Sequence, residues 1–206
     1  MKPYYSEPGI DIYLGDCRDI LPSLPKVDLV LTDPPYGIDL KNTNPIYKDS
    51  AIYGDEEDFD PTFLLPFENL IIWGANNFAH KLPKGGWLCW DKRCNEIADK
   101  AIGSPFELAW INKPSMFKIK RLQHGGFINA DVPNQKRFHP TQKPIDLMMW
   151  CIELLDNPQT ILDPFMGSGT TLRAAKDLGR KAIGIEIEEK YCEIAVSRLR
   201  QEVLPL

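Results

Sequence analysis

The chain has 206 residues, of which 43% are hydrophobic and 26% are charged, and its formal net charge is −5. This composition is typical of a globular protein with one domain and a full core, and the net charge argues against a protein that simply coats nucleic acid. No apolar run approaches the length of a membrane span, and the first residues do not resemble a signal peptide. We therefore expect a cytoplasmic protein without membrane contact.

The number and spacing of the cysteines indicate neither disulfide bonds nor a zinc site. The five cysteines are an odd number, and no two of them are spaced as Cys-x-x-Cys. This pattern predicts neither a disulfide framework nor a structural zinc site, and we expect no metal ligands.

The first half of the chain begins with a β-α-β pattern, which favours a parallel sheet. We predict a strand over residues 10–14, a short helix over 18–24 and a buried strand over 27–31. Residues 37–61 mix Gly, Asn, Pro and acidic residues without a period, so they predict a long flexible loop. The segments that follow are predicted as helices over 61–65, 78–82 and 95–102 and strands over 69–73, 87–90 and 106–111.

The second half alternates helices with strands. Residues 113–137 predict at most a pair of edge strands. Helices are expected over 145–155, 171–178 and 191–204, and strands over 160–163 and 181–187. No internal repeat is present, and the whole chain, residues 1–206, predicts a single α/β domain.

The stretch around which the chain is organised is Asp33-Pro34-Pro35-Tyr36, which ends the predicted strand over 27–31. The prolines end strand pairing because they have no N–H group and restrict the residue before them. The result is a rigid carboxylate, a rigid carbonyl and an aromatic ring at the carboxyl end of a strand, where open α/β sheets bind ligands. A simple proline turn with Tyr36 in the core is the alternative.

A second constellation lies between the strands over 160–163 and 181–187. Gly167-Ser168-Gly169 follows Asp163 at the start of a helix, where backbone N–H groups can approach a ligand closely. Glu186 ends the next strand and is placed to bind ribose hydroxyls. The dinucleotide pattern Gly-x-Gly-x-x-Gly is incomplete and the lysine of a P-loop is absent. A ribose-bearing, positively charged ligand such as S-adenosylmethionine fits better, and Asp163 could face its charge.

The basic residues of the middle segment are unevenly placed. Between residues 113 and 143 Asp131 is the only acid. A local basic stripe can contact phosphates, although a solvated basic loop has the same composition. The candidate residues for contact with nucleic-acid phosphates are Lys118, Lys120, Arg121, Lys136 and Arg137.

Together, three motifs resemble those of the DNA amino-methyltransferases. They are Asp33-Pro34-Pro35-Tyr36, His139-Pro140-Thr141-Gln142-Lys143-Pro144 and Asp163-Pro164-Phe165-Met166-Gly167-Ser168-Gly169-Thr170. Their order resembles the permuted group called the β class. The resemblance implies a Rossmann-like, S-adenosylmethionine-dependent fold with a mostly parallel sheet, helices on both faces and a circularly permuted motif order. It also implies a bacterial or phage origin.

The resemblance further implies methyl transfer to the N6 amine of adenine in double-stranded DNA, with the base flipped out of the duplex. Asp33, Pro34, Pro35 and Tyr36 would be catalytic. The residues implied to bind the cofactor are Asp16, Cys17, Asp33, Thr141, Lys143, Asp163, Phe165, Gly167, Ser168, Gly169, Thr170 and Glu186. For Thr141 and Lys143 a helix-start turn is the alternative.

Three other activities stay open. They are N4 methylation of cytosine, methylation of RNA or a protein amide, and a catalytically silent DNA-binding module. Residues 113–138, where the family carries its target-recognition region, are short in this chain. The loop over 37–61 or the second subunit of a homodimer could supply additional surface.

Overall fold

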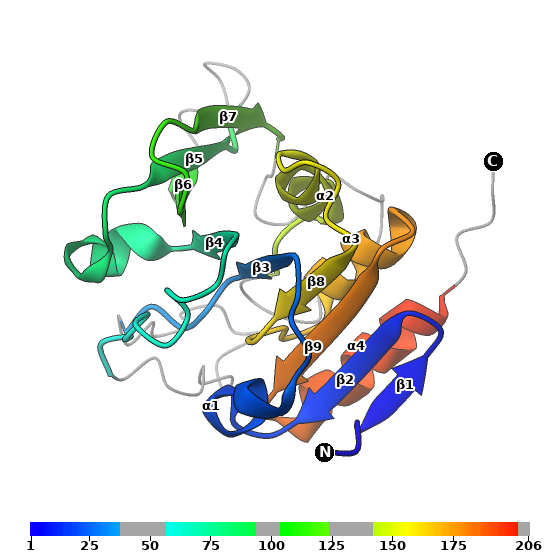
Figure 1. Ribbon diagram of the computed structural model, residues 1–206. Helices are drawn as coiled ribbons and strands as arrows, with labels where there is room; N and C mark the ends of the chain where they lie inside the picture. The colour runs from blue at the N-terminus through cyan, green and yellow to red at the C-terminus, as the bar shows by residue number, and fades with distance from the viewer. Residues whose placement is uncertain (38–56, 94–103, 124–141, 202–206) are drawn as a thin grey trace, which may run out of the picture.

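The computed structural model of the chain describes residues 1–37, 57–93, 104–123 and 142–201 (Figure 1). Its strands are β1 (Tyr5–Glu7), β2 (Ile10–Leu14), β3 (Leu29–Thr32), β4 (Leu70–Trp73), β5 (Gly86–Asp91), β6 (Phe106–Ile111), β7 (Phe117–Arg121), β8 (Thr160–Asp163) and β9 (Lys181–Glu186). Its α-helices are α1 (Cys17–Ile20), α2 (Ile145–Glu153), α3 (Thr170–Asp177) and α4 (Glu189–Arg200), and its 3₁₀ helices are η1 (Leu21–Ser23) and η2 (Ala75–Lys81).

These strands form one sheet in the order β1-β2-β9-β8-β3-β4-β6-β5-β7. The central strands β2, β9, β8, β3 and β4 are parallel, whereas β6 runs antiparallel to both of its neighbours. From β3 the chain continues to β4 on one side, and from β8 it continues to β9 on the other. The boundary between β3 and β8 is therefore a topological switch point, where open sheets of this kind bind ligands.

Strand β3 is buried along its whole length because helical layers cover both faces of the sheet. Leu29 and Leu31 pack into a core formed with α2, α3 and α4, whereas Val30 packs into a second core formed with α1 and η2. This alternation follows from the two-residue period of a strand. The predicted continuous apolar run is thus confirmed as a central strand with two buried faces.

Most predicted elements are present within the described residues, but the helix over 61–65 is wrong. That segment forms successive turns, in which the Leu64 N–H donates to the Pro61 carbonyl at 2.9 Å. Pro66 has no N–H group and disfavours a helical conformation at Leu65, so the turn cannot extend into a helix. The helix predicted over 95–102 lies outside the described residues. Of the edge strands predicted within residues 113–137, β7 is present at the end of the sheet, and the part of that segment after residue 123 lies outside the described residues.

Candidate active site

The tetrapeptide lies directly after β3 and is held by a compact set of hydrogen bonds. Tyr36 donates its hydroxyl hydrogen to Asp33 Oδ1 at 2.6 Å, and Lys143 Nζ donates to Asp33 Oδ2 at 2.6 Å. Lys143 also donates to the Tyr36 hydroxyl oxygen at 3.1 Å. Lys143 precedes α2, so the start of that helix brings a cation onto the carboxylate at the end of β3.

Four charged groups share this buried region. Burial raises the pKa of the Asp33 carboxyl, and the adjacent Lys143 ammonium acts in the opposite direction. Burial would lower the pKa of Lys143, but the carboxylates of Asp33 and Glu107 raise it well above its usual value. Burial would likewise raise the pKa of Glu107, yet Lys143 and Lys92 hold it at about 2. The site therefore keeps Lys143 charged and Glu107 ionised.

Gly74 makes room for the Tyr36 ring. It follows β4 with φ 69°, in the left-handed region. A Cβ atom at this position would lie 1.9 Å from Tyr36 Cε1, which is far inside van der Waals contact. Glycine is therefore required here both by its backbone conformation and by the ring against it.

We expect Gly74→Ala to displace the Tyr36 ring and to lower the free energy of unfolding by about 1–3 kcal/mol, the cost of an overpacked and strained position. Urea unfolding measures this change. Gly179→Ala is the matched control, since Gly179 also has a positive φ (68°) but open space around it. A loss for Gly74→Ala no larger than for Gly179→Ala would contradict the close contact with Tyr36.

The glycine turn after β8 is built for close backbone approach. Gly167 and Gly169 both have positive φ, and no atom lies within 4 Å of a Cβ built on Gly167. Gly169 is the N-cap of α3 and supplies no side-chain cap to that helix. Glu186 at the end of β9 accepts from the Gly167 N–H at 3.0 Å, so this carboxylate supports the turn directly.

Asp163 joins the ends of the two central strands. Its Oδ1 accepts from Thr32 Oγ1 at 2.7 Å and from the Phe165 N–H at 3.1 Å, and its side chain is buried. Burial raises the pKa of this carboxyl to about 6. It lies against its own turn and β3, and it holds the tetrapeptide and the glycine turn beside each other.

This raised pKa predicts a pH-dependent stability. The folded protein retains a proton on Asp163 up to about pH 6, whereas the unfolded chain releases it near pH 4, so the stabilisation present in acid is lost as the pH rises. From pH 5 to pH 7.5 Asp163 should lower the free energy of unfolding by about 1.4 kcal/mol. Urea unfolding of Asp163→Asn should lack this component, and identical pH profiles for the two proteins would refute it.

A buried arginine anchors the glycine turn from the other end of the chain. Arg198 of α4 donates to the Ser168 carbonyl at 2.6 Å, to Ser168 Oγ at 2.9 Å and to Thr170 Oγ1 at 3.1 Å. Ser168 Oγ also bonds to Gln142 Oε1 at 3.3 Å. The turn is thus connected both to α4 and to the segment that carries Lys143.

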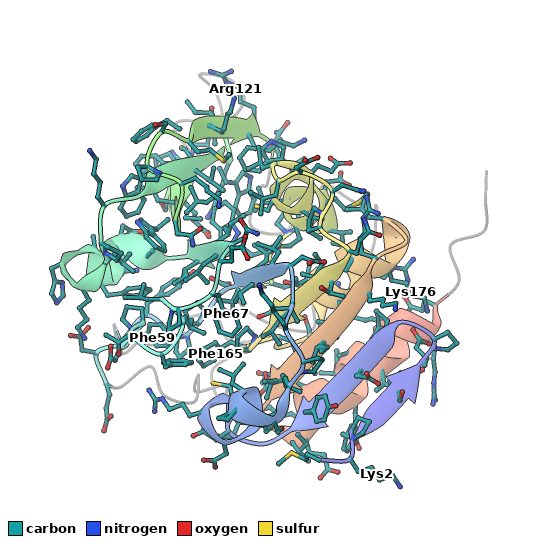
Figure 2. The ribbon with its side chains drawn as sticks, viewed as in Figure 1. Lys2, Phe59, Phe67, Arg121, Phe165 and Lys176 are labelled. Carbon is teal, nitrogen blue, oxygen red and sulfur yellow. The ribbon has the colours of Figure 1, made fainter. Side chains whose placement is uncertain are left out.

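Three aromatic rings, those of Phe59, Phe63 and Phe165, pack together beside the carboxyl end of β8. Phe165 packs edge-on against Phe59 at 5.5 Å and Phe63 at 6.4 Å between ring centroids, and Figure 2 shows Phe59 next to Phe165.

Asp16 is the exposed N-cap of α1, where it accepts from the Arg18 N–H. The Cys17 thiol is buried in the core, which raises its pKa to about 12.

With this geometry established, comparison with known proteins identifies the family. A family model described as DNA methylase matches residues 87–197, which is more than half of the chain. The chain belongs to the DNA methylase family. The matched stretch contains nearly all of β5, the elements from β6 to β9 and most of α4, and it begins after the tetrapeptide.

Two curated relatives and one solved structure support this assignment. Putative methylase YubD of Escherichia coli is 30% identical over 210 residues, which span 90% of this chain and 88% of YubD. Type II methyltransferase M.HindIII of Haemophilus influenzae is 44% identical over 80 residues, 38% of this chain but only 26% of M.HindIII. The M1.HpyAVI–SAM complex is 26% identical with a TM-score of 0.56, and the match covers 93% of this chain and all of that one. The expected Rossmann-like methyltransferase fold is confirmed.

The family's expected site residues fall into three groups. The first group lies around the carboxyl ends of β2, β3, β8 and β9 and contains the tetrapeptide, Asp16, Cys17, Lys143, Asp163, Phe165, the glycine turn with Thr170, and Glu186. Three of the expected basic residues lie instead on β7, the last strand of the sheet, and Figure 2 shows Arg121 far from Phe165. The remaining three, Thr141, Lys136 and Arg137, lie outside the described residues.

Three residues of this site were not predicted from the sequence: Glu107, Gly74 and Arg198. Glu107 carried the clearest available signal, because a single acidic residue interrupts the apolar strand over 106–111. Burial of such a residue requires a cationic partner, which the spacing alone does not identify. Gly74 and Arg198 gave no comparable signal, since each depends on a contact distant in the sequence.

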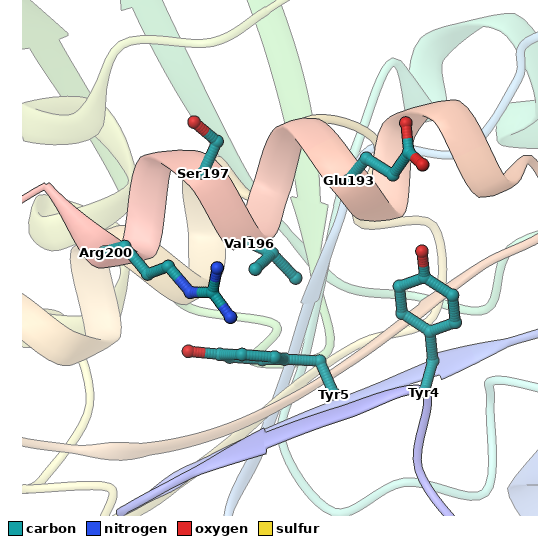
Figure 3. Close-up of a pocket in the computed structure, with 6 residues that line it drawn as sticks. All are labelled: Tyr4, Tyr5, Glu193, Val196, Ser197 and Arg200. Atoms are coloured by element: carbon teal, nitrogen blue, oxygen red, sulfur yellow. The ribbon is translucent and has the colours of Figure 1, made fainter.

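A hollow elsewhere on the surface does not coincide with this site. It lies between α4 and the start of β1, where Tyr4, Tyr5 and Arg200 line it together with Glu193, Val196 and Ser197 (Figure 3). None of the expected site residues contributes to it. Within the described residues, no helix combines the length and apolar character that crossing a membrane requires.

Proposed function

We propose that this protein transfers a methyl group from S-adenosylmethionine to the N6 amine of adenine in double-stranded DNA, with the target base flipped out of the duplex. The observation that carries the proposal is the placement of Asp33-Pro34-Pro35-Tyr36 beside the Gly167-Ser168-Gly169 turn at the switch point of the sheet. Membership of the DNA methylase family supports it. The tetrapeptide precedes the glycine turn in the chain, which supports the permuted β-class order.

The glycine turn is suited to hold the cofactor. There is open space beside Gly167, and the start of α3 has no side-chain cap, so backbone N–H groups there can bind a ligand. Asp16 follows β2 and Glu186 ends β9, and the carboxyl ends of these two strands lie next to each other. S-adenosylmethionine supplies a methyl group on a positively charged sulfur, and M1.HpyAVI was solved with this compound. We assign its binding to Asp16, Cys17, Asp33, Thr141, Lys143, Asp163, Phe165, Gly167, Ser168, Gly169, Thr170 and Glu186.

The tetrapeptide is suited to activate an exocyclic amine. Such an amine is a weak nucleophile because its lone pair is delocalised into the ring. The Asp33 carboxylate and the Pro34 carbonyl would accept its two hydrogens and direct the lone pair toward the methyl group. The prolines fix these acceptors before the substrate arrives, which is electrostatic preorganisation. Tyr36 would stack on the flipped base, since the amine cannot be reached inside the duplex.

Transfer then requires only an in-line displacement. The amine nitrogen would form its bond to the methyl carbon as the carbon–sulfur bond breaks and its electron pair returns to sulfur, and the nitrogen would then release one proton to water. Because no covalent enzyme intermediate forms, the main contribution of the protein is positioning.

DNA contact is proposed for the basic residues of β7 and the segment after it. Lys118 and Arg121 are exposed, and Lys120 is partly exposed. They are the described candidates for phosphate contact in the short recognition region, residues 113–138, and Lys136 and Arg137 of the same region are proposed as further candidates. The loop over 37–61 and a second copy of the chain are the proposed sources of further DNA contact.

Mass spectrometry of nucleosides from unmethylated DNA incubated with the protein and S-adenosylmethionine tests the function, with calorimetry of cofactor binding beside it. N6-methyladenine would support the proposal. N4-methylcytosine would retain the mechanism and change the substrate. Cofactor binding without either product would contradict the proposal and favour a silent DNA-binding module.

A further inference from the structure

Four charged side chains meet in the buried region beside the tetrapeptide, and two of them, Glu107 and Lys92, have no assigned role. Glu107 Oε1 pairs with Lys92, while Oε2 lies 3.1 Å from Lys143 Nζ. Lys143, 5% exposed, lies between Glu107 and Asp33. The two carboxylates and two ammonium groups sum to zero net charge, as burial of such groups requires.

Lys143 uses its two carboxylate partners unequally. It donates hydrogen bonds to Asp33 Oδ2 and to the Tyr36 hydroxyl. With Glu107 Oε2 it forms an ion pair without the geometry of a hydrogen bond, and that oxygen accepts none within the described residues. Glu107 Oε2 is therefore a buried, charged acceptor that lies 3.1 Å from the Lys143 ammonium, while that ammonium donates its hydrogen bonds to Asp33 and Tyr36.

This arrangement conflicts with the proposed use of Asp33. An amine attacking a methyl group becomes more positive as the new bond forms, and Asp33 must accept a hydrogen from that amine. An ammonium bonded to the same carboxylate competes for its lone pairs and repels the growing charge. Transfer of the Lys143 hydrogen bond from Asp33 Oδ2 to Glu107 Oε2 would remove the competition without leaving Lys143 unpaired.

We propose that Glu107 is a positioning residue that takes Lys143 from Asp33 when the substrate amine binds. The inference rests on the proposed function, and the ligand it serves is the exocyclic amine of a flipped base. In the absence of substrate Lys143 holds Asp33 in place. When the amine occupies Asp33, Glu107 carries the hydrogen bond that Lys143 gives up.

The test compares the wild type with E107Q and with E107Q/K143M at saturating cofactor and DNA. We expect kcat of E107Q to fall by about 10- to 100-fold, the scale of one electrostatic contact, because Lys143 keeps its bond to Asp33. Cofactor Kd by calorimetry should stay within threefold of the wild type. In the double variant the competing ammonium is absent, so kcat should recover at least about tenfold relative to E107Q.

The double variant distinguishes a positioning role of Glu107 from a merely structural one. If Glu107 were only structural, removing Lys143 as well would lower kcat below that of E107Q. E68Q is the matched control: Glu68 is exposed, and within the described residues its carboxylate pairs with the exposed Lys26, so kcat should be unchanged. A kcat of E107Q within threefold of the wild type, or a double variant no more active than E107Q, would overturn the inference. If E107Q does not fold, E107D replaces it, because this variant keeps the negative charge but moves the carboxylate away from Lys143. A lower kcat of E107D with unchanged cofactor Kd would support the positioning role of Glu107. An unchanged kcat would refute it. Absence of methylation by the wild type would instead refute the proposed function.

Discussion

Asp33→Ala is expected to lower turnover at least about 10²-fold, because the variant loses the preorganised acceptor of the substrate amine. Tyr36 and Lys143 each hold the Asp33 carboxylate at 2.6 Å and fix its orientation, and Asp33 accepts the amine hydrogen once Lys143 has moved to Glu107. Cofactor affinity should be retained, because the glycine turn and Glu186 are unaltered. Single-turnover methylation and calorimetry measure the two quantities separately.

Asp156→Ala is the matched control for this prediction, since Asp156 is exposed beyond α2 and should give wild-type turnover. Near-normal turnover of Asp33→Ala would remove the proposed mechanism. A parallel loss of cofactor affinity would show instead that Asp33 acts mainly in cofactor binding.

Arg198→Met is expected to lower the free energy of unfolding by about 2–4 kcal/mol. The substitution keeps much of the side-chain volume but leaves the Ser168 carbonyl, Ser168 Oγ and Thr170 Oγ1 without their buried charged donor. Because these atoms belong to the glycine turn, cofactor affinity should fall as well. Urea unfolding and calorimetry provide the two measurements.

Arg200→Met, two residues further along α4, is the control. Arg200 is exposed and its guanidinium stacks on the Tyr5 ring at 5.3 Å, so its loss should cost no more than about 1 kcal/mol. If Arg198→Met were as stable as Arg200→Met, the anchoring of the glycine turn by α4 would be refuted.

The sequence by itself determined the order of the elements and the two motifs at the switch point. The run over residues 27–31 was identifiable as a central strand because an uninterrupted apolar stretch suits a strand covered on both faces. Glycines at 167 and 169 and prolines at 34 and 35 were equally readable, since their backbone restrictions act locally. These local constraints, joined to the resemblance they carry, led to the fold that the comparisons confirm.

Only the tertiary structure decided which distant side chains meet. Lys143 was expected near the cofactor, but its contacts with Asp33 and Glu107 depend on how α2 packs on β3 and on the place of β6 in the sheet, beyond β4. The need for glycine at position 74 likewise arises from a ring 38 positions earlier in the chain. Such contacts join residues whose spacing follows no period, because chain folding brings them together and local backbone preference does not.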